Sequence, residues 1–157
     1  MIQRIQTVYL AIAIILLSSV TVGLELFSFV GNESTYVFNS FGITELNAKR
    51  EIIQQTNYPV YIGLIALILL SFICLMSYKD LKRQFKLGRT IFYLYFLMVV
   101  VLLIISVFGD SILDIENAKR HLGLGFYLFV VGFPFTFLAN TGIKRDKRLL
   151  ESMDRLR

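Results

Sequence analysis

The sequence predicts an all-α membrane protein, a four-transmembrane-helix bundle with a small β-hairpin outside the membrane and both termini in the cytoplasm. Three observations predict this fold class: 56% of the 157 residues are hydrophobic, only 17% are charged, and the uncharged residues gather in four long runs. A soluble domain usually has about 25% charged residues. The composition also excludes a disordered chain, and the single cysteine excludes an internal disulfide bond.

Four windows without a charged residue indicate the membrane spans. They contain 20, 27, 20 and 22 residues and cover positions 5–24, 52–78, 90–109 and 122–143. A helix of 20 residues is about 30 Å long, which matches the hydrocarbon thickness of a bilayer. The run 91–108 is apolar on every side, whereas a soluble amphipathic helix carries charges on one face. Within a single membrane domain of residues 1–157 we therefore expect spans at about 5–25, 58–78, 90–109 and 122–140.

The basic residues predict the orientation, because the cytoplasmic loops of membrane proteins are enriched in Lys and Arg. With the N terminus inside, twelve Lys and Arg residues fall on the cytoplasmic side and four on the outer side. The cytoplasmic ones are Arg4, five in the loop 79–89 and six in the tail 141–157. The net charge of +5 then divides into +8 inside and −3 outside. This charge is an orientation signal, and no nucleic-acid partner is expected.

Two connections on the outer side, 26–57 and 110–121, are predicted to fold outside the bilayer. In the first, residues 26–30 and 35–41 are rich in β-branched and aromatic side chains and flank a Gly-Asn-Glu-Ser turn, which predicts a β-hairpin. The polar residues 44–56 that follow are predicted to form a helix. The second connection is predicted to form a short helix at the membrane interface.

The cytoplasmic tail, residues 141–157, alternates apolar and charged side chains at helical spacing. Such a pattern is typical of an amphipathic helix at a membrane surface. We therefore expect a C-terminal amphipathic helix that lies along the inner headgroups or against a cytoplasmic partner.

Residues that could carry out chemistry are scarce. No Lys, Arg, Asp, Glu or His lies within the four windows, so a proton relay has almost no titratable side chain to use. Cys74 and His121 are the only cysteine and histidine, which is too few for a zinc cluster. The motifs of phosphate-binding loops and of serine hydrolases are absent. The sequence therefore predicts no catalytic residue, no metal site, no cofactor and no enzyme activity.

Small residues at seven-residue spacing predict where the helices approach one another. Those on the first and fourth windows are Ala11, Ser18, Gly125, Gly132 and Ala139. Arg4 and Glu25 continue the first stripe at its two ends, so Glu25 is expected at the outer edge of the first span. Helix packing is one interpretation of this stripe. The alternative is that Ala11, Ser18 and Glu25 line a transport path, since small channels can use backbone and hydroxyl groups alone.

The two ends of the chain carry a family resemblance. The N-terminal residues MIQRIQT lead directly into a span. The matching C-terminal residues are Leu138-Ala139-Asn140, Ile143-Lys144, Asp146, Leu149-Leu150 and Ser152-x-Asp154-Arg155-Leu156-Arg157. With the layout of the whole chain, they resemble the domain-of-unknown-function family 4293, four-span inner-membrane proteins of Bacteroidetes-type bacteria. The resemblance implies a bacterial inner-membrane location and carries no activity, cofactor or catalytic residue.

The resemblance draws attention to the two cytoplasmic ends. Arg4 and either Asp146 or Asp154 are expected at the same membrane face, so an Arg–carboxylate contact could join the termini into one surface. The candidate interaction residues are Arg4, Glu25, Asn140, Asp146, Asp154 and Arg155. We expect a structural or accessory subunit that binds membrane lipids or a partner membrane protein, or that self-associates. The alternatives are a small oligomeric transporter or channel and, third, an integral membrane enzyme.

Overall fold

The computed structural model describes residues 3–31, 34–47, 49, 51–112 and 119–154. Within these residues, four helices and one five-stranded antiparallel sheet are present, and the strand order in the sheet is β4-β3-β2-β1-β5. The elements, in chain order, are α1 Gln3–Thr21, β1 Phe27–Val30, β2 Ser34–Asn39, β3 Gly42–Asn47, β4 Ile52–Asn57, α2 Val60–Met76, α3 Leu81–Ile112, β5 Lys119–Leu122 and α4 Leu124–Asp154.

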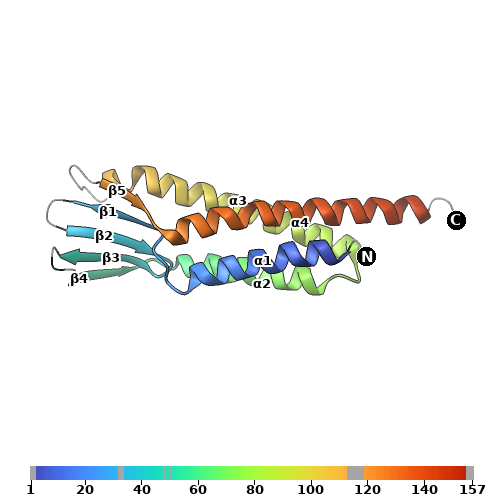
Figure 1. Cartoon of the computed structure of the whole chain (residues 1–157), viewed down its shortest axis with the longest axis horizontal. Coiled ribbons are helices and arrows are strands. Elements are labelled where there is room, and N and C mark those ends of the chain that lie inside the picture. The colour runs from blue at the N-terminus through green and yellow to red at the C-terminus, as the bar shows by residue number, and fades with distance from the viewer. Residues whose placement is uncertain (1–2, 32–33, 48, 50, 113–118, 155–157) are drawn as a thin grey trace.

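The helices lie side by side, and the sheet stands at one end of them (Figure 1). Helix α1 packs against α2 and α4, and α3 packs against the same two helices. Helix α1 begins and α4 ends far from the sheet, where α2 also passes into α3 (Figure 1). The molecule therefore has a sheet end and, opposite to it, a helical end.

The predicted all-α fold class and four-transmembrane-helix bundle are wrong. A five-stranded sheet is part of the fold. Among the described residues, two helices are long and apolar enough to cross a membrane, through Leu81–Gly109 and Leu124–Leu149. The apolar helices Ile5–Thr21 and Val60–Met76 are shorter.

The sheet replaces the small hairpin and the polar helix that the sequence predicted for the first outer connection. Strands β1 and β2 pair antiparallel at the place predicted for the hairpin. The predicted helix 44–56 is wrong, because β3 and β4 occupy it as a second antiparallel pair. Asn39 Oδ1 accepts hydrogen bonds from the backbone N–H groups of Phe41 and Gly42, at 2.9 and 3.0 Å, and so fixes the turn into β3. Thr and Ile residues in this region suit the pleated, half-buried surface of a strand.

The second outer connection also differs from its prediction. Helix α3 continues to Ile112, and Lys119–Leu122 forms strand β5 in place of an interfacial helix. Strand β5 pairs antiparallel with β1, so Leu122 stands opposite Phe27. The middle of the predicted interfacial helix, 113–118, lies outside the described residues.

Two predicted cytoplasmic segments belong to the long helices. Most of the predicted loop 79–89 is the beginning of α3, where Asp80 Oδ1 accepts from the N–H groups of Lys82 and Arg83 at 3.0 and 3.1 Å and caps the helix. The tail is no separate amphipathic helix, because α4 continues through it to Asp154. No glycine or proline after Gly142 interrupts the helical spacing there, so the charged residues extend the helix past the apolar window.

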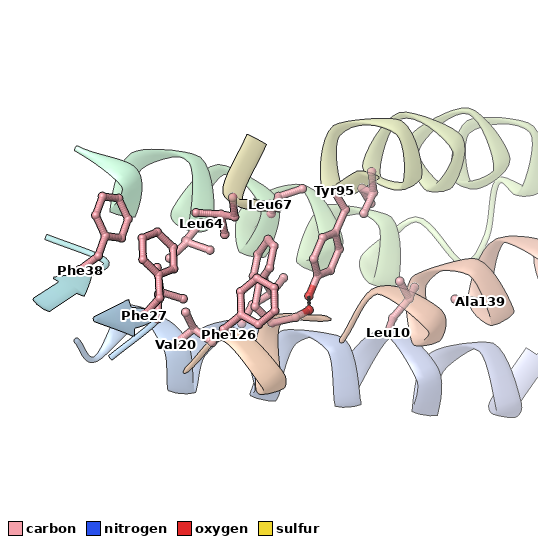
Figure 2. Close-up of a cluster of buried hydrophobic side chains, with 14 of the residues drawn as sticks. Leu10, Val20, Phe27, Phe38, Leu64, Leu67, Tyr95, Phe126 and Ala139 are labelled. Atoms are coloured by element: carbon pink, nitrogen blue, oxygen red, sulfur yellow. Dashed lines mark hydrogen bonds between the residues drawn. The ribbon is translucent and has the colours of Figure 1, made fainter. Parts of the chain in front are cut away.

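The core extends from the sheet into the middle of the helices (Figure 2). At the sheet end, the rings of Phe27 and Phe38 stack with their centroids 4.6 Å apart. In the middle of the helices, Tyr95 Oη donates to the backbone carbonyl of Phe129 at 2.7 Å, drawn as the dashed line in Figure 2. This approach requires Gly132, because a Cβ there would lie 2.3 Å from Tyr95 Oη.

Candidate functional site

An apolar cavity of about 280 Å³ lies where the inner face of the sheet meets the sheet ends of α2 and α3. Strands β1, β2 and β3 supply five of its lining residues, and the segment before α2, α2 itself and α3 supply the others. The lining residues are Phe27, Phe29, Tyr36, Phe38, Ile43, Tyr58, Val60, Ile105 and Gly109. None of these described lining residues is charged, and we call this space the junction cavity.

The strand periodicity places the aromatic side chains on one wall. Successive side chains of a strand point to opposite faces, so residues two apart share a face. Phe27 and Phe29 in β1 and Tyr36 and Phe38 in β2 therefore face the helices together. The sequence prediction did not identify this site, although the alternating motifs Phe-Ser-Phe and Tyr-Val-Phe were a signal for a shared aromatic face.

Gly109 allows the wall of α3 to come close to the sheet. A Cβ at this position would lie 2.6 Å from the ring of Phe29, nearer than real carbon atoms approach. The rings of Phe27 and Phe29 in turn meet edge to face at a centroid distance of 5.7 Å. The shape of the junction cavity thus depends on a glycine in the helix and two aromatic rings in the strand.

Polar groups occur at the rim of the junction cavity. Tyr36 Oη donates to Glu45 Oε1 at 2.9 Å, so its hydroxyl is already occupied. Tyr58 is 49% exposed and stands between the sheet and α2. Ligand pockets usually have volumes of about 300–1,000 Å³. At about 280 Å³ the junction cavity suits a slender apolar group, and the hydroxyls of Tyr36 and Tyr58 are the polar side-chain groups among its described lining residues.

A second feature, at the helical end, is a buried polar contact between α1 and α4. Gln6 Nε2 donates to Asp146 Oδ2, and both side chains are buried. Gln6 was not singled out from the sequence, although it is one of the few polar residues in its apolar window. Asn140 was a candidate residue in the sequence. Its buried Oδ1 points toward α3, and a Cβ at Gly88 would lie 3.1 Å from this oxygen.

The small residues predicted to form a packing seam are buried or half-buried in the part of the chain that the structure describes. Ala11 and Ser18 are half-buried on α1, and Gly132 and Ala139 are buried on α4. Ser18 Oγ donates to the Ile14 carbonyl of its own helix at 2.8 Å.

Glu25 and Gly125 meet through the backbone. The Gly125 N–H donates to the Glu25 carbonyl at 2.8 Å, and a Cβ at Gly125 would lie 2.8 Å from the same oxygen. The side chain of Glu25 is exposed. Glu25 therefore joins the connection after α1 to the start of α4 by its backbone.

The remaining candidate residues are at the two chain ends. Arg4 belongs to α1 and Asp154 ends α4, but their side chains, like the whole of Arg155, lie outside the described part. The described contact of Asp146 is with Gln6. Among the described residues, no three His, Cys, Asp or Glu side chains lie close enough together to hold a metal ion.

A family model described as "Domain of unknown function (DUF4293)" matches residues 2–156, which is nearly the whole chain. No curated protein matches the sequence.

Proposed function

Because the chain belongs to the DUF4293 family, whose description assigns no activity, we infer its function from the junction cavity. We propose that it is a non-enzymatic membrane protein, an accessory component of the bacterial inner membrane that binds the apolar chain of a lipid. The single observation that carries this proposal is an uncharged aromatic cavity beside helices that expose apolar side chains.

The long helices support a place in the membrane. The most apolar window of α3 has a mean hydropathy of 2.9, yet only 22% of it is buried inside the protein. The corresponding window of α4 has a mean hydropathy of 1.5 and is 33% buried. A soluble core helix would bury such residues, since a large exposed apolar surface is rare on soluble proteins. Lipid is the solvent that fits these surfaces.

The distribution of charge supports an orientation with both termini in the cytoplasm. Basic residues gather at the helical end, on the first turns of α3 and the last turns of α4. The positive-inside rule assigns this end to the cytoplasm. The sheet end is then outside the cytoplasm, and the junction cavity lies near the outer headgroups.

The chemistry of the junction cavity favours a lipid chain as its ligand. Apolar groups gain about 25 cal/mol for each Å² removed from water, and the wall of the cavity consists mainly of aromatic and aliphatic side chains that suit them. At about 280 Å³ the cavity holds part of an acyl chain and not a whole lipid. The rest of the lipid remains in the bilayer, and the exposed side chain of Ile104 on α3 already faces that environment.

A photo-crosslinking experiment tests this proposal. The full chain, reconstituted in phospholipid nanodiscs, is irradiated with phosphatidylcholine that carries a diazirine on one acyl chain close to the headgroup, and the adducts are mapped by peptide mass spectrometry. We expect adducts on cavity residues such as Tyr36 and Phe38. Ile105→Phe should remove them, because the larger side chain fills the cavity.

The matched control is Ile104→Phe. Ile104 is the next residue on α3, is 51% exposed and does not line the cavity, so this change should leave the adducts in place. Adducts spread evenly over the outer faces of α3 and α4, or adducts that survive Ile105→Phe, would overturn the proposal. Thermal unfolding of both variants verifies that each one is folded.

A further inference from the structure

One face of α4 near its end points away from the other helices. The buried residues of this part of the helix are Ala139, Ile143 and Asp146. Thr141, Lys144, Arg145, Arg148 and Leu149 lie on other faces of the same turns, and together they line a groove of about 360 Å³. We call this surface the basic groove.

The cations of the basic groove have no ion-pair partner among the described residues. Within the described part of the chain, no carboxylate lies within ion-pair distance of Lys144, Arg145 or Arg148. Lys147, on the inner side of the same turn, has two partners. Its Nζ lies 3.5 Å from Glu151 Oε1 and 5.2 Å from the centroid of the Phe85 ring. On these turns of α4, the described cations without an ion pair therefore lie on the outward surface.

The basic groove continues directly into an apolar surface. Phe137 and Leu138 precede Thr141 by four and three residues, so they lie one turn nearer the middle of α4 on the same side. Both are exposed, at 52% and 42%. At its other end the groove includes Leu149, an apolar residue among the cations.

We propose that the basic groove binds the headgroup of an anionic phospholipid from the cytoplasmic leaflet, with the acyl chains along Phe137 and Leu138. The cations match a phosphodiester, and basic pockets on the cytoplasmic side of membrane helices suit anionic headgroups. A soluble anion would leave the adjoining apolar surface unused. The inference rests on the proposed orientation in the membrane and is independent of the junction cavity at the opposite end.

Native mass spectrometry of the full chain in mild detergent tests the inference. The protein is titrated with phosphatidylglycerol or with phosphatidylcholine, in the presence and absence of soluble glycerol phosphate. Phosphatidylglycerol should bind at least about tenfold more tightly than phosphatidylcholine, and glycerol phosphate should not displace it. Each basic side chain contributes a factor of about five at an anionic surface, so Arg145→Gln/Arg148→Gln should weaken phosphatidylglycerol binding about 30-fold.

The control variant removes an equal number of positive charges at the sheet end. Lys49→Gln/Lys119→Gln changes two exposed lysines there and should alter the affinity less than about twofold. Equal weakening by both double variants, or equal affinity for the two lipids, would overturn the inference. Displacement by glycerol phosphate would overturn it as well, because the groove would then be a site for a soluble anion. Ile105→Phe should leave this binding intact, which separates it from the lipid site in the junction cavity.

Discussion

Gln6 and Asp146, 140 residues apart in the sequence, meet in a buried hydrogen bond. Only 2% of Gln6 and 7% of Asp146 is exposed. The contact joins the start of the first helix to the last turns of α4. Each side chain keeps one oxygen, Gln6 Oε1 and Asp146 Oδ1, that has no hydrogen-bond partner among the described residues. A buried polar pair that is only half satisfied responds strongly to substitution.

Asp146→Asn should preserve or raise the stability of the protein, whereas Gln6→Ala should lower it. In Asp146→Asn, the new amide oxygen still accepts from Gln6 and the new NH₂ group can donate to Gln6 Oε1. Gln6→Ala leaves a buried carboxylate without its donor, which costs about 1–3 kcal/mol. The free energy of unfolding of the detergent-solubilised protein measures both changes.

Glu151→Gln is the control for this pair of variants. Its side chain is 52% exposed on the same helix, so removing its charge should change the free energy of unfolding by less than about 1 kcal/mol. If Asp146→Asn unfolds as readily as Gln6→Ala, the amide and the carboxylate do not form the pair described here.

Tyr95 and Gly132 should show a strong non-additive effect. Gly132→Ala brings a methyl group to 2.3 Å from Tyr95 Oη and should destabilise the protein by about 1–3 kcal/mol. Tyr95→Phe alone removes the bond to the Phe129 carbonyl and should cost about 1 kcal/mol. In the Tyr95→Phe background, the nearest ring atom to the new methyl is 3.4 Å away, so Gly132→Ala should then cost little. A double-mutant cycle of unfolding free energies tests this prediction, and simple additivity would contradict it.

Gly109→Ala should disturb the junction cavity. The new Cβ would lie 2.6 Å from the Phe29 ring, which must then move from its place in the cavity wall. We expect a loss of stability of about 1–3 kcal/mol and a several-fold decrease in cavity crosslinking. Gly63→Ala is the control, because its Cβ meets only the flexible end of the Met98 side chain at 3.0 Å. Equal effects of the two substitutions would speak against a role of the Phe29 contact.

Cysteine labelling in intact cells should give opposite results at the two ends of the molecule. The natural Cys74 is buried, so it is replaced by Ala and single cysteines are introduced at exposed positions. A membrane-impermeant maleimide, in cells with a permeabilised outer membrane, should label Thr56→Cys on the sheet before lysis. It should label Lys82→Cys, at the start of α3, only after lysis. Labelling of Lys82→Cys in intact cells would reverse the proposed orientation.

The helix positions could largely be predicted from the sequence, but the strands could not. The uncharged window 52–78 contains α2, yet its first residues, 52–57, form β4. The predicted span 58–78 agrees with α2, whereas Gln54 and Gln55 belonged to the predicted polar helix 44–56 and lie in β4. Strand β5 has the sequence Lys-Arg-His-Leu, which carries no strand pattern, and its conformation comes from pairing with β1.

The sites were harder to predict than the helices, because they too depend on contacts between segments that are distant in the sequence. The aromatic residues of β1 and β2 could be assigned to strands, but the partner of their shared face depends on how the sheet docks against α2 and α3. Asp146 was recognised as a candidate, with an arginine as the expected partner. The structure pairs it with the amide of Gln6, a neutral donor that charge patterns do not reveal.

The pairing of β5 with β1 has a consequence for the order of folding. Strands β1 to β4 follow one another in the chain and can pair as local hairpins as soon as they are synthesised. The other edge of β1 stays unpaired until Lys119–Leu122 is synthesised, after α2 and α3. Such a non-local contact forms late. During that interval β1 presents an open strand edge, and the nascent chain is then most prone to pair wrongly with another molecule.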